Sequence, residues 1–408
     1  MLFLSLLGCS LLEIREQVKI LEQDGEIRGR IAVTVPVEGT VVVRCYHLKD
    51  KTFVSDTFTY VTSSGEFHFD VSPGTYYIAA FVEQNGDGRY QDSEPGNYYQ
   101  SETGTPLAIV VGPGETVDAG LLLISGKPPP LQGYNAVHLP AKIIANIGAR
   151  ASLDDPMFSR ENSALGLWKP LQFLDGVGGG LFLLHDYRSD RIPVLFVHGL
   201  NGTPLDWKEV IDNLDRNRFQ PWVIFYPSGF RLDMISDYLV KAMVTLHDRY
   251  RFQEIYIISH SMGGLVARSA IMKTLQKFPR TAGTIQLLVT VNSPLGGMES
   301  AASGVRHSPI VLPVWRDLAP QSRFMEVMRS WFLPEEIPYH LFFSYLDGRS
   351  DDSVVPLQSQ IPLQHQFHAT RIYGFNDTHT GTLKNIDFIK TFNSILLDIA
   401  DRGRLTQP

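Results

Sequence analysis

The hydrophobic pattern divides the chain into two parts with different periods. Between Gly29 and Ile124, β-branched and aromatic residues alternate with polar ones in short runs, as expected of strands with one buried face. Turn signals such as Ser72-Pro73-Gly74 separate these runs at the spacing of a small antiparallel sandwich. The pattern predicts an all-β sandwich domain over residues 25–125. Its strands are expected at 31–37, 40–46, 57–61, 66–71, 75–82, 107–111 and 117–124.

After residue 180, apolar runs alternate with stretches whose apolar residues stand three or four positions apart. Strands are expected at 181–184, 194–197, 221–226, 254–259, 285–291, 339–345 and 371–375. Helices are expected at 206–214, 235–250, 264–277 and 385–400. This alternation predicts βαβ units, and therefore a mostly parallel sheet with flanking helices over residues 181–408. In such a sheet, catalytic residues follow the carboxyl ends of strands.

Two segments lack a clear period. The run Pro128-Pro129-Pro130 favours extended polyproline II and cannot continue a sheet, so we expect a linker and a poorly readable segment over 126–180. The second segment, about 295–335, interrupts the α/β part and is rich in large apolar residues. We expect it to be either a cap over an acyl-binding site or a helical excursion packed into the core.

The two parts of the chain also differ in charge. Of the 408 residues, 44% are hydrophobic and 19% are charged, which is ordinary globular usage and argues against disorder. Residues 1–127 hold nine basic and 17 acidic side chains, whereas the remainder holds 27 and 26. The acidity therefore belongs to the predicted sandwich. The chain has no basic stripe, which argues against a nucleic-acid partner.

The chain has two cysteines, Cys9 and Cys45, too few for a disulfide framework. Cys9 ends an apolar run that is too short to span a bilayer. The segment Leu6-Leu7-Gly8-Cys9 resembles the end of a bacterial lipoprotein signal, in which the cysteine is lipid-modified. Residues 1–9 would then be the signal remnant, and the protein would be anchored in the bacterial cell envelope, with the outer membrane as the expected place. The alternative is an apolar tail with an unmodified cysteine.

The loop 83–94 has the spacing of a calcium-binding loop. Glu83, Asn85, Asp87 and Glu94 place oxygen-bearing side chains at positions one, three, five and twelve, and Gly88 occupies position six. A predicted strand precedes the loop where an EF-hand would have a helix. We therefore expect either a structural calcium site on a β-hairpin or an acidic, solvated turn.

The segment 255–266 has the pattern of a nucleophile elbow. An apolar strand leads into His260-Ser261-Met262-Gly263-Gly264, and a helix leaves it. Small residues around the serine let the strand and the helix approach each other and turn the serine outward. Ser259 stands where the G-x-S-x-G motif has its first glycine. Ser261 is the expected nucleophile, and we expect His260 to have a structural role.

A serine nucleophile of this kind needs an acid and a base from later strands, in the order Ser, Asp, His. His379 follows the last predicted strand and is the expected base, whereas His365 and His368 precede that strand. Three carboxylates compete for the role of the acid. Asp352 is preferred because it stands four residues before Pro356, and the alternatives, in order, are Asp351 and Asp347.

The oxyanion hole is expected beside the first core strand. That strand ends in Val197-His198-Gly199-Leu200, a glycine-containing loop whose backbone N–H groups can turn toward the serine. The expected donors are the N–H groups of Leu200 and of Met262, which follows the nucleophile.

Together, Val197-His198-Gly199-Leu200, the elbow around Ser261 and the turns that carry Asp352 and His379 resemble those of lipase-type α/β-hydrolases. Bacterial triacylglycerol lipases and GPI-inositol-deacylase-like enzymes belong to this group. The resemblance covers the chain from about Ile192 to its C-terminus and not the predicted all-β sandwich before it. It implies an α/β-hydrolase fold and hydrolysis of acyl or lipid esters through an acyl-serine, without a catalytic cofactor. The alternatives are an acyltransferase or thioesterase with the same triad, and a catalytically silent surface-binding lipoprotein.

Overall fold

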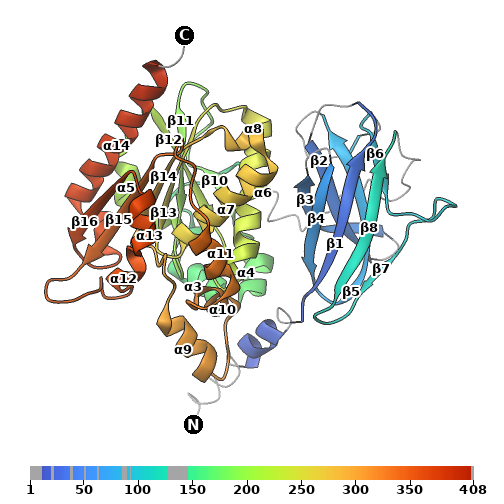
Figure 1. The fold of residues 1–408 in the computed structure, drawn as a ribbon, viewed down its shortest axis with the longest axis horizontal. Coiled ribbons are helices and arrows are strands. Elements are labelled where there is room, and N and C mark those ends of the chain that lie inside the picture. Colours follow the sequence, from blue (N-terminus) through green and yellow to red (C-terminus); the bar gives the residue numbers. More distant parts are fainter. Residues whose placement is uncertain are drawn as a thin grey trace. The chain divides into compact units, whose positions relative to one another are not determined.

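The computed structural model describes residues 12–19, 23–36, 40–49, 52–61, 64–84, 90–91, 93–126 and 146–405. They belong to two compact units, Met1–Ala145 and Asn146–Pro408 (Figure 1). The first unit is built from strands, apart from a helical stretch at 12–19. The second unit alternates strands and helices.

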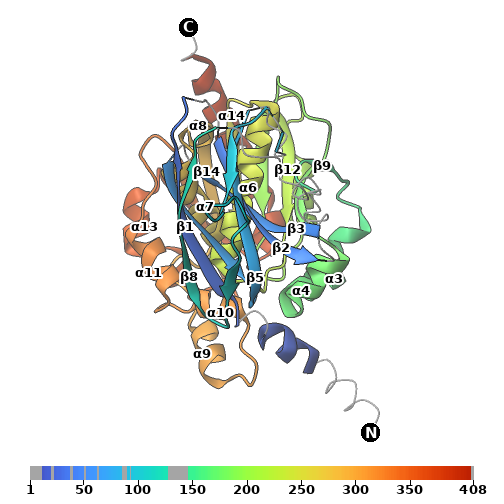
Figure 2. The same cartoon turned by 90° about the vertical axis from the view of Figure 1, so that its right-hand side faces the viewer.

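The first unit contains two β-sheets. One has the order β4-β1-β8, and the other has the order β3-β2-β5-β6 with β7 paired to β5. Strands β1 and β8 run side by side in parallel (Figure 2), whereas β1 pairs with β4 in the antiparallel direction. The strands are β1 (Gly25–Val33), β2 (Thr40–Lys49), β3 (Thr52–Val61), β4 (Ser64–Val71), β5 (Gly74–Glu83), β6 (Gly96–Tyr98), β7 (Ile109–Val111) and β8 (Thr116–Ile124).

Both sheets of the first unit contribute to one hydrophobic core. Ile27 of β1 and Phe69 of β4 pack in the same cluster as Val43 of β2 and Ile78 of β5. Cys45 is fully buried in this cluster, as expected of a cysteine that acts as a small hydrophobe. Alternation along the strands therefore gives each sheet one apolar face, and the two faces share a core.

The second unit is organised around an eight-stranded sheet with the order β16-β15-β14-β13-β11-β12-β10-β9. The six strands β16, β15, β14, β13, β11 and β12 are each parallel to their neighbours in the sheet, whereas β10 runs antiparallel to β12. The strands are β9 (Ala149–Arg150), β10 (Gly180–Leu183), β11 (Ile192–Val197), β12 (Phe219–Phe225), β13 (Ile255–His260), β14 (Ile285–Val291), β15 (Tyr339–Tyr345) and β16 (Arg371–Asn376).

Helices cover both faces of this sheet. Helices α6 and α7 pack together on one face, and α5 and α14 lie on the other (Figure 1). The long helices are α6 (Leu232–Tyr250), α7 (Gly263–Lys277) and α14 (Ile386–Leu405). The shorter ones are α3 (Arg160–Trp168), α4 (Pro170–Gly176), α5 (Lys208–Asp212), α8 (Pro279–Ala282), α9 (Glu299–His307), α10 (Pro313–Leu318), α11 (Arg323–Ser330), α12 (Leu357–Gln360) and α13 (Leu363–His368). Single 3₁₀ turns occur at Pro156–Phe158, Pro204–Trp207 and Gly381–Lys384.

The structure corrects the sequence expectations in two places. Residues 146–180 are part of the second unit, because β9 pairs with β10 and helices α3 and α4 pack there. The second unit therefore begins at residue 146 rather than at 181, inside the segment 126–180 that was predicted as a linker and a poorly readable segment. In the first unit, β1 begins at Gly25 rather than at residue 31, and the three-residue strand β6 has no counterpart in the prediction.

Several predictions fall on residues that the structure does not describe. Cys9 lies among them, as do Asn85 and Asp87 of the acidic loop and residues 127–145. Lipid modification of Cys9 and calcium binding therefore stay predictions. Within the described residues, no helix combines the length and the apolar character that crossing a membrane requires.

Candidate active site

Ser261 lies in a strained turn between β13 and α7. Its backbone has φ 55°, in the left-handed region that a residue with a side chain rarely adopts. The Ser261 amide donates to the carbonyl of Val291 at 2.8 Å, which fixes the turn to the end of β14. A Cβ atom at Gly263 would lie 2.5 Å from the carbonyl oxygen of His198, so only glycine lets α7 start this close to β11.

Ser259 meets the packing requirement of the elbow. The residue is fully buried, and its hydroxyl donates to the carbonyl of Val289 at 2.9 Å. The hydroxyl therefore satisfies its own hydrogen bond within the sheet. This explains how serine can stand where the motif has its first glycine.

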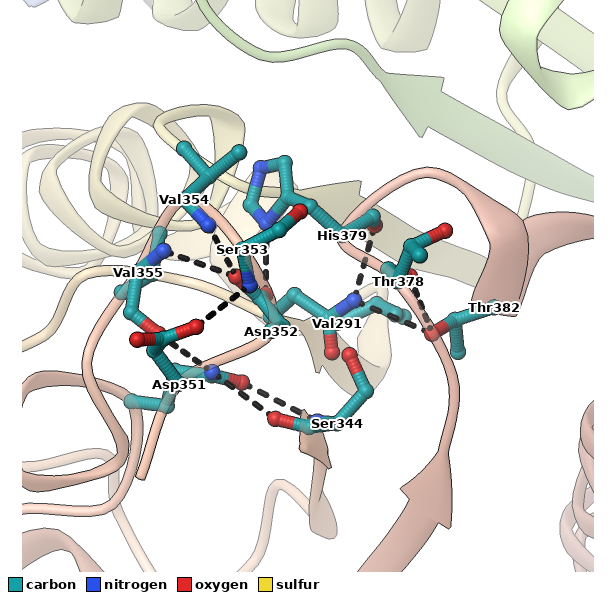
Figure 3. Close-up of polar contacts among 12 residues, drawn as sticks. Val291, Ser344, Asp351, Asp352, Ser353, Val354, Val355, Thr378, His379 and Thr382 are labelled. Carbon is teal, nitrogen blue, oxygen red and sulfur yellow. Dashed lines mark hydrogen bonds and ion pairs between the residues drawn. The ribbon is translucent and has the colours of Figure 1, made fainter. Parts of the chain in front are cut away.

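Asp352 and His379 are brought together from the loops after β15 and β16 (Figure 3). The Nδ1 atom of His379 lies 2.6 Å from Oδ2 of Asp352, and the Asp352 carboxylate is fully buried. Its other oxygen, Oδ1, accepts the backbone N–H groups of Val354 and Val355 at 2.9 and 2.7 Å. The His379 amide also donates to the Asp352 carbonyl at 2.8 Å. The carboxylate is thus held in one orientation, with one oxygen reserved for the imidazole.

The other two candidate acids do not contact His379. The Asp351 carboxylate pairs with the guanidinium of Arg349 at 2.9 Å and accepts the amide of Ser353 at 2.8 Å. The exposed side chain of Asp347 has no recorded contact with the imidazole in the described part of the chain. Ser353 has φ 83°, so the turn after Asp352 uses a conformation that favours glycine.

Neither of the other two histidines considered as the base lies in this arrangement. The ring of His368 stacks on Phe332 at 3.9 Å between centroids, and the ring of His365 lies 6.0 Å from the same phenylalanine. Their rings therefore pack against the insertion and do not contact Asp352.

His260 anchors the loop that carries His379, a role that sequence reasoning did not assign. Its Nε2 atom lies 2.8 Å from the carbonyl oxygen of His379, and the side-chain amide of Asn292 donates to the same oxygen at 2.8 Å. Because a carbonyl can only accept, Nε2 of His260 must carry the proton. Burial, together with the charge on nearby His379, lowers the pKa of His260 to about 3, so the ring is neutral at physiological pH. The loop is thereby tied to the ends of β13 and β14.

The loop after β11 lies against the serine. A Cβ atom built at Gly199 would be 2.6 Å from Cβ of Ser261 and 3.1 Å from its Oγ, so the backbone passes immediately beside the hydroxyl. Neither the N–H of Leu200 nor that of Met262 donates a hydrogen bond to another described residue. Met262 is buried, and a buried donor without a partner is rare. Both groups are available to an oxygen atom of a bound molecule.

His198 braces this loop. Its Nδ1 atom lies 2.8 Å from the carbonyl of Gly199, its Nε2 accepts the amide of Tyr226 at 3.3 Å, and the two rings stack at 4.0 Å. Burial lowers the pKa of His198 to about 4, which agrees with a neutral ring whose proton is on Nδ1. The hydroxyl of Ser228 adds a further tie by accepting the amide of Asn201 at 3.0 Å.

The insertion at 295–335 forms helices α9, α10 and α11, which are firmly packed on the body of the unit. The buried carboxylate of Asp317 forms an ion pair with Arg231 at 2.7 Å and accepts the amide of Leu232 at the start of α6. Arg268 of α7 donates to the carbonyl of Trp331 at 2.7 Å, and its guanidinium lies 5.3 Å from that indole ring. Of the two sequence expectations, the packed helical excursion describes what is seen, and a role over bound acyl chains stays a prediction.

In the first unit, Glu94 closes the acidic loop. Its two carboxylate oxygens accept the amides of Gln84 and Gln91, each at 2.9 Å. Burial and the neighbouring carboxyl of Glu83 raise the pKa of Glu94 to about 7, against the opposing effect of these two hydrogen bonds. The carboxyl groups of Glu83 and Glu94 therefore lie close together.

Comparison with known proteins begins with a family described as the PGAP1-like alpha/beta domain, which matches residues 227–312. This stretch contains Ser261 and its elbow but ends before Asp352 and His379. The match agrees with the mostly parallel sheet and the strained serine already described. The second unit has the α/β-hydrolase fold. No curated protein sequence matches the chain.

Similar solved structures include the product of gene lin2722 of Listeria innocua, which is 17% identical with a TM-score of 0.39 and covers 50% of this chain and 92% of that one. The mature lipase BlEst2 of Bacillus licheniformis is 16% identical with a TM-score of 0.42, covering 53% and 97%. An esterase of Thermogutta terrifontis is 14% identical with a TM-score of 0.37, covering 51% and 90%.

Proposed function

We propose that the protein is a serine ester hydrolase that cleaves acyl esters through an acyl-Ser261 intermediate. The observation that carries the proposal is the buried pair of Asp352 and His379, which faces the same strand ends as the strained Ser261. A carboxylate that holds one imidazole nitrogen leaves the other nitrogen to accept a proton from a nucleophile. The proposed roles are nucleophile for Ser261, general base and acid for His379, and orienting acid for Asp352.

In the acylation step, Oγ of Ser261 attacks the carbonyl carbon of the ester while its proton passes to Nε2 of His379. The carbonyl oxygen becomes negatively charged and accepts hydrogen bonds from the N–H groups of Leu200 and Met262. Each such donor contributes roughly 3 to 4 kcal/mol to lowering the barrier. When the tetrahedral intermediate collapses, the C–O bond to the alcohol breaks, and His379 returns its proton to the departing oxygen.

In the deacylation step, water replaces the alcohol. His379 takes a proton from the water molecule, whose oxygen attacks the acyl carbon under the same two N–H groups. Collapse of the second intermediate releases the carboxylic acid and restores the Ser261 hydroxyl. Asp352 stays ionised throughout and stabilises the imidazolium that forms in both steps.

The proposed substrates are acyl esters, including esters of lipids. The insertion follows the carboxyl end of β14, the edge of the sheet at which an acyl chain on Ser261 would lie. Lipid modification of Cys9, as predicted from the sequence, would hold the enzyme at a membrane that contains such esters. Membrane association is therefore part of the proposal.

The direct test compares Ser261→Ala with Ser259→Ala in the hydrolysis of p-nitrophenyl esters of increasing acyl length. Both serines are buried on the same segment, but only Ser261 is proposed to react, because the Ser259 hydroxyl is bonded within the sheet. We expect Ser261→Ala to lose hydrolysis and Ser259→Ala to keep it. Equal activity of Ser261→Ala and the unmodified chain would overturn the proposal.

Product analysis distinguishes hydrolysis from transfer. With alcohols added to the reaction, a hydrolase releases mainly the carboxylic acid, whereas an acyltransferase releases a new ester. A preference for thioesters over oxygen esters of the same acyl chain would instead identify a thioesterase.

A further inference from the structure

A cavity of about 450 Å³ lies at the amino ends of β15 and β16, between these strands and helix α14. The three elements lie together at one edge of the second unit (Figure 1). Asp352 and His379 follow the carboxyl ends of the same two strands. Strands of six or seven residues rise about 3.3 Å per residue, so roughly 20 Å separates the cavity from the proposed catalytic residues. The cavity is therefore a separate place in the molecule.

One wall of the cavity is a single face of α14, because its residues stand three or four positions apart. Its polar members are Lys390, Thr391, Ser394, Asp398 and Arg402. The sheet supplies the opposite wall.

The sheet wall combines a cation with two aromatic rings. Arg371 begins β16, and the rings of His340 and Tyr373 stack with 5.9 Å between centroids and 11° between planes. The Tyr373 hydroxyl lies 3.3 Å from Nδ1 of His340, which fixes both rings. Tyr373 also stacks on Phe342 at 4.6 Å between centroids, so its ring is held between two others and this wall is rigid beside a positive charge.

The lining carries an excess of positive charge. Arg371, Lys390 and Arg402 face one carboxylate, that of Asp398. Within the described part of the chain, neither Arg371 nor Lys390 has a carboxylate within ion-pair distance. Burial, together with the charges of Arg371 and Arg402, lowers the pKa of His340 to about 4. The imidazole is therefore neutral at physiological pH, and the cations dominate the charge of the lining.

We propose that this cavity binds a phosphate ester, with the phosphate held by Arg371 and Lys390 and the organic part lying against the rings of Tyr373 and His340. Arginine and lysine are the side chains best suited to phosphate oxygens. The volume lies within the range of small-molecule sites, and a lone phosphate ion would fill only part of it. A phosphate ester occurs both in soluble metabolites and in phospholipid headgroups, and the experiment below distinguishes these two sources.

The test measures the binding of sn-glycerol 3-phosphate, the soluble probe, to the full chain by calorimetry. Every variant, and the parent, carries Cys9→Ser so that no lipid is attached at this position. Vesicles of phosphatidylcholine, with and without phosphatidylglycerol, are the lipid probes in a sedimentation assay. The pocket variant is Arg371→Gln with Lys390→Gln. The matched control is Arg306→Gln with Lys384→Gln, which removes the same charge from exposed positions outside the cavity.

We expect the pocket variant to weaken binding by at least about tenfold, because charge-assisted hydrogen bonds are lost, and the control to bind as the parent does. Loss confined to glycerol 3-phosphate identifies a soluble ester, and loss confined to phosphatidylglycerol vesicles identifies a headgroup. Absence of binding to either probe would overturn the proposal, and so would equal binding by the pocket variant and the parent. Unchanged ester hydrolysis by the pocket variant checks that it is folded.

Discussion

The role of Asp352 can be tested with a substitution that keeps its shape. Asp352→Asn replaces one carboxylate oxygen by an NH₂ group. Oδ1 accepts two backbone N–H groups, those of Val354 and Val355, and an NH₂ group in that place would face two donors. The asparagine must therefore keep its oxygen there and turn its NH₂ toward Nδ1 of His379, which now lies 2.6 Å from Oδ2.

This orientation forces His379 into the wrong tautomer. Nδ1 has to accept from the asparagine, so the proton moves to Nε2, which can no longer take the proton of Ser261. In serine hydrolases with this arrangement, such a change lowers kcat by about 10⁴. At about 1.4 kcal/mol per tenfold, the loss amounts to about 5 kcal/mol of transition-state stabilisation.

The assay is kcat and KM for a short p-nitrophenyl ester, with Asp351→Asn as the matched control. Asp351 is the neighbouring carboxylate, but it pairs with Arg349 and does not contact His379. We expect Asp351→Asn to keep at least about a fifth of the parent kcat, since losing an exposed ion pair changes free energies by less than about 1 kcal/mol. The reasoning is refuted if Asp352→Asn retains more than about a tenth of the parent kcat, or if the two variants lose activity equally.

Three further predictions concern His260, Gly199 and Glu94. His260→Phe keeps a ring but removes the donor to the His379 carbonyl, so kcat should fall about tenfold with little change in KM. The role would be contradicted if the loss of activity came entirely from a smaller fraction of folded protein. Gly199→Ala places a methyl group 2.6 Å from Cβ of Ser261, and displacement of the serine should lower kcat/KM by about 100-fold; normal activity would mean that the loop does not lie against the serine. Glu94 has a pKa of about 7 in the folded chain, above the ordinary value of 4.5 for a glutamate, so the folded state binds more protons than the unfolded state. The contribution of Glu94 to stability is therefore full below pH 4.5 and declines as the pH rises through about 7. Thermal unfolding from pH 5 to 8 should show this decline in the parent and not in Glu94→Gln, and identical pH profiles would contradict it.

The sequence pattern predicted the elements of the second unit well, because buried parallel strands and amphipathic helices have distinct periods. The expected strands at 285–291 and 339–345 coincide with β14 and β15. The pattern failed at 146–180, where α3 and α4 are short and only half buried, so neither shows a clear apolar stripe. It also missed β6, since three residues are too few to display alternation.

The order of motifs along the chain was enough to predict two residues of the candidate site. Motif spacing singled out Ser261, and position after the last strand singled out His379. The spacing to Pro356 favoured Asp352 over Asp351, but only the structure shows which of the two contacts the imidazole, because adjacent residues in a turn point in different directions. The anchoring role of His260 was hidden for the same reason, since its partner, the carbonyl of His379, is over a hundred positions away in the chain.

The central claim is that Ser261 is an activated nucleophile. A fluorophosphonate probe reacts with such serines, and mass spectrometry of the labelled chain identifies the modified residue. The account predicts stoichiometric labelling at Ser261, which Asp352→Asn slows strongly and Asp351→Asn leaves nearly unchanged. A folded chain that stays unlabelled, or is labelled at another serine, would contradict it.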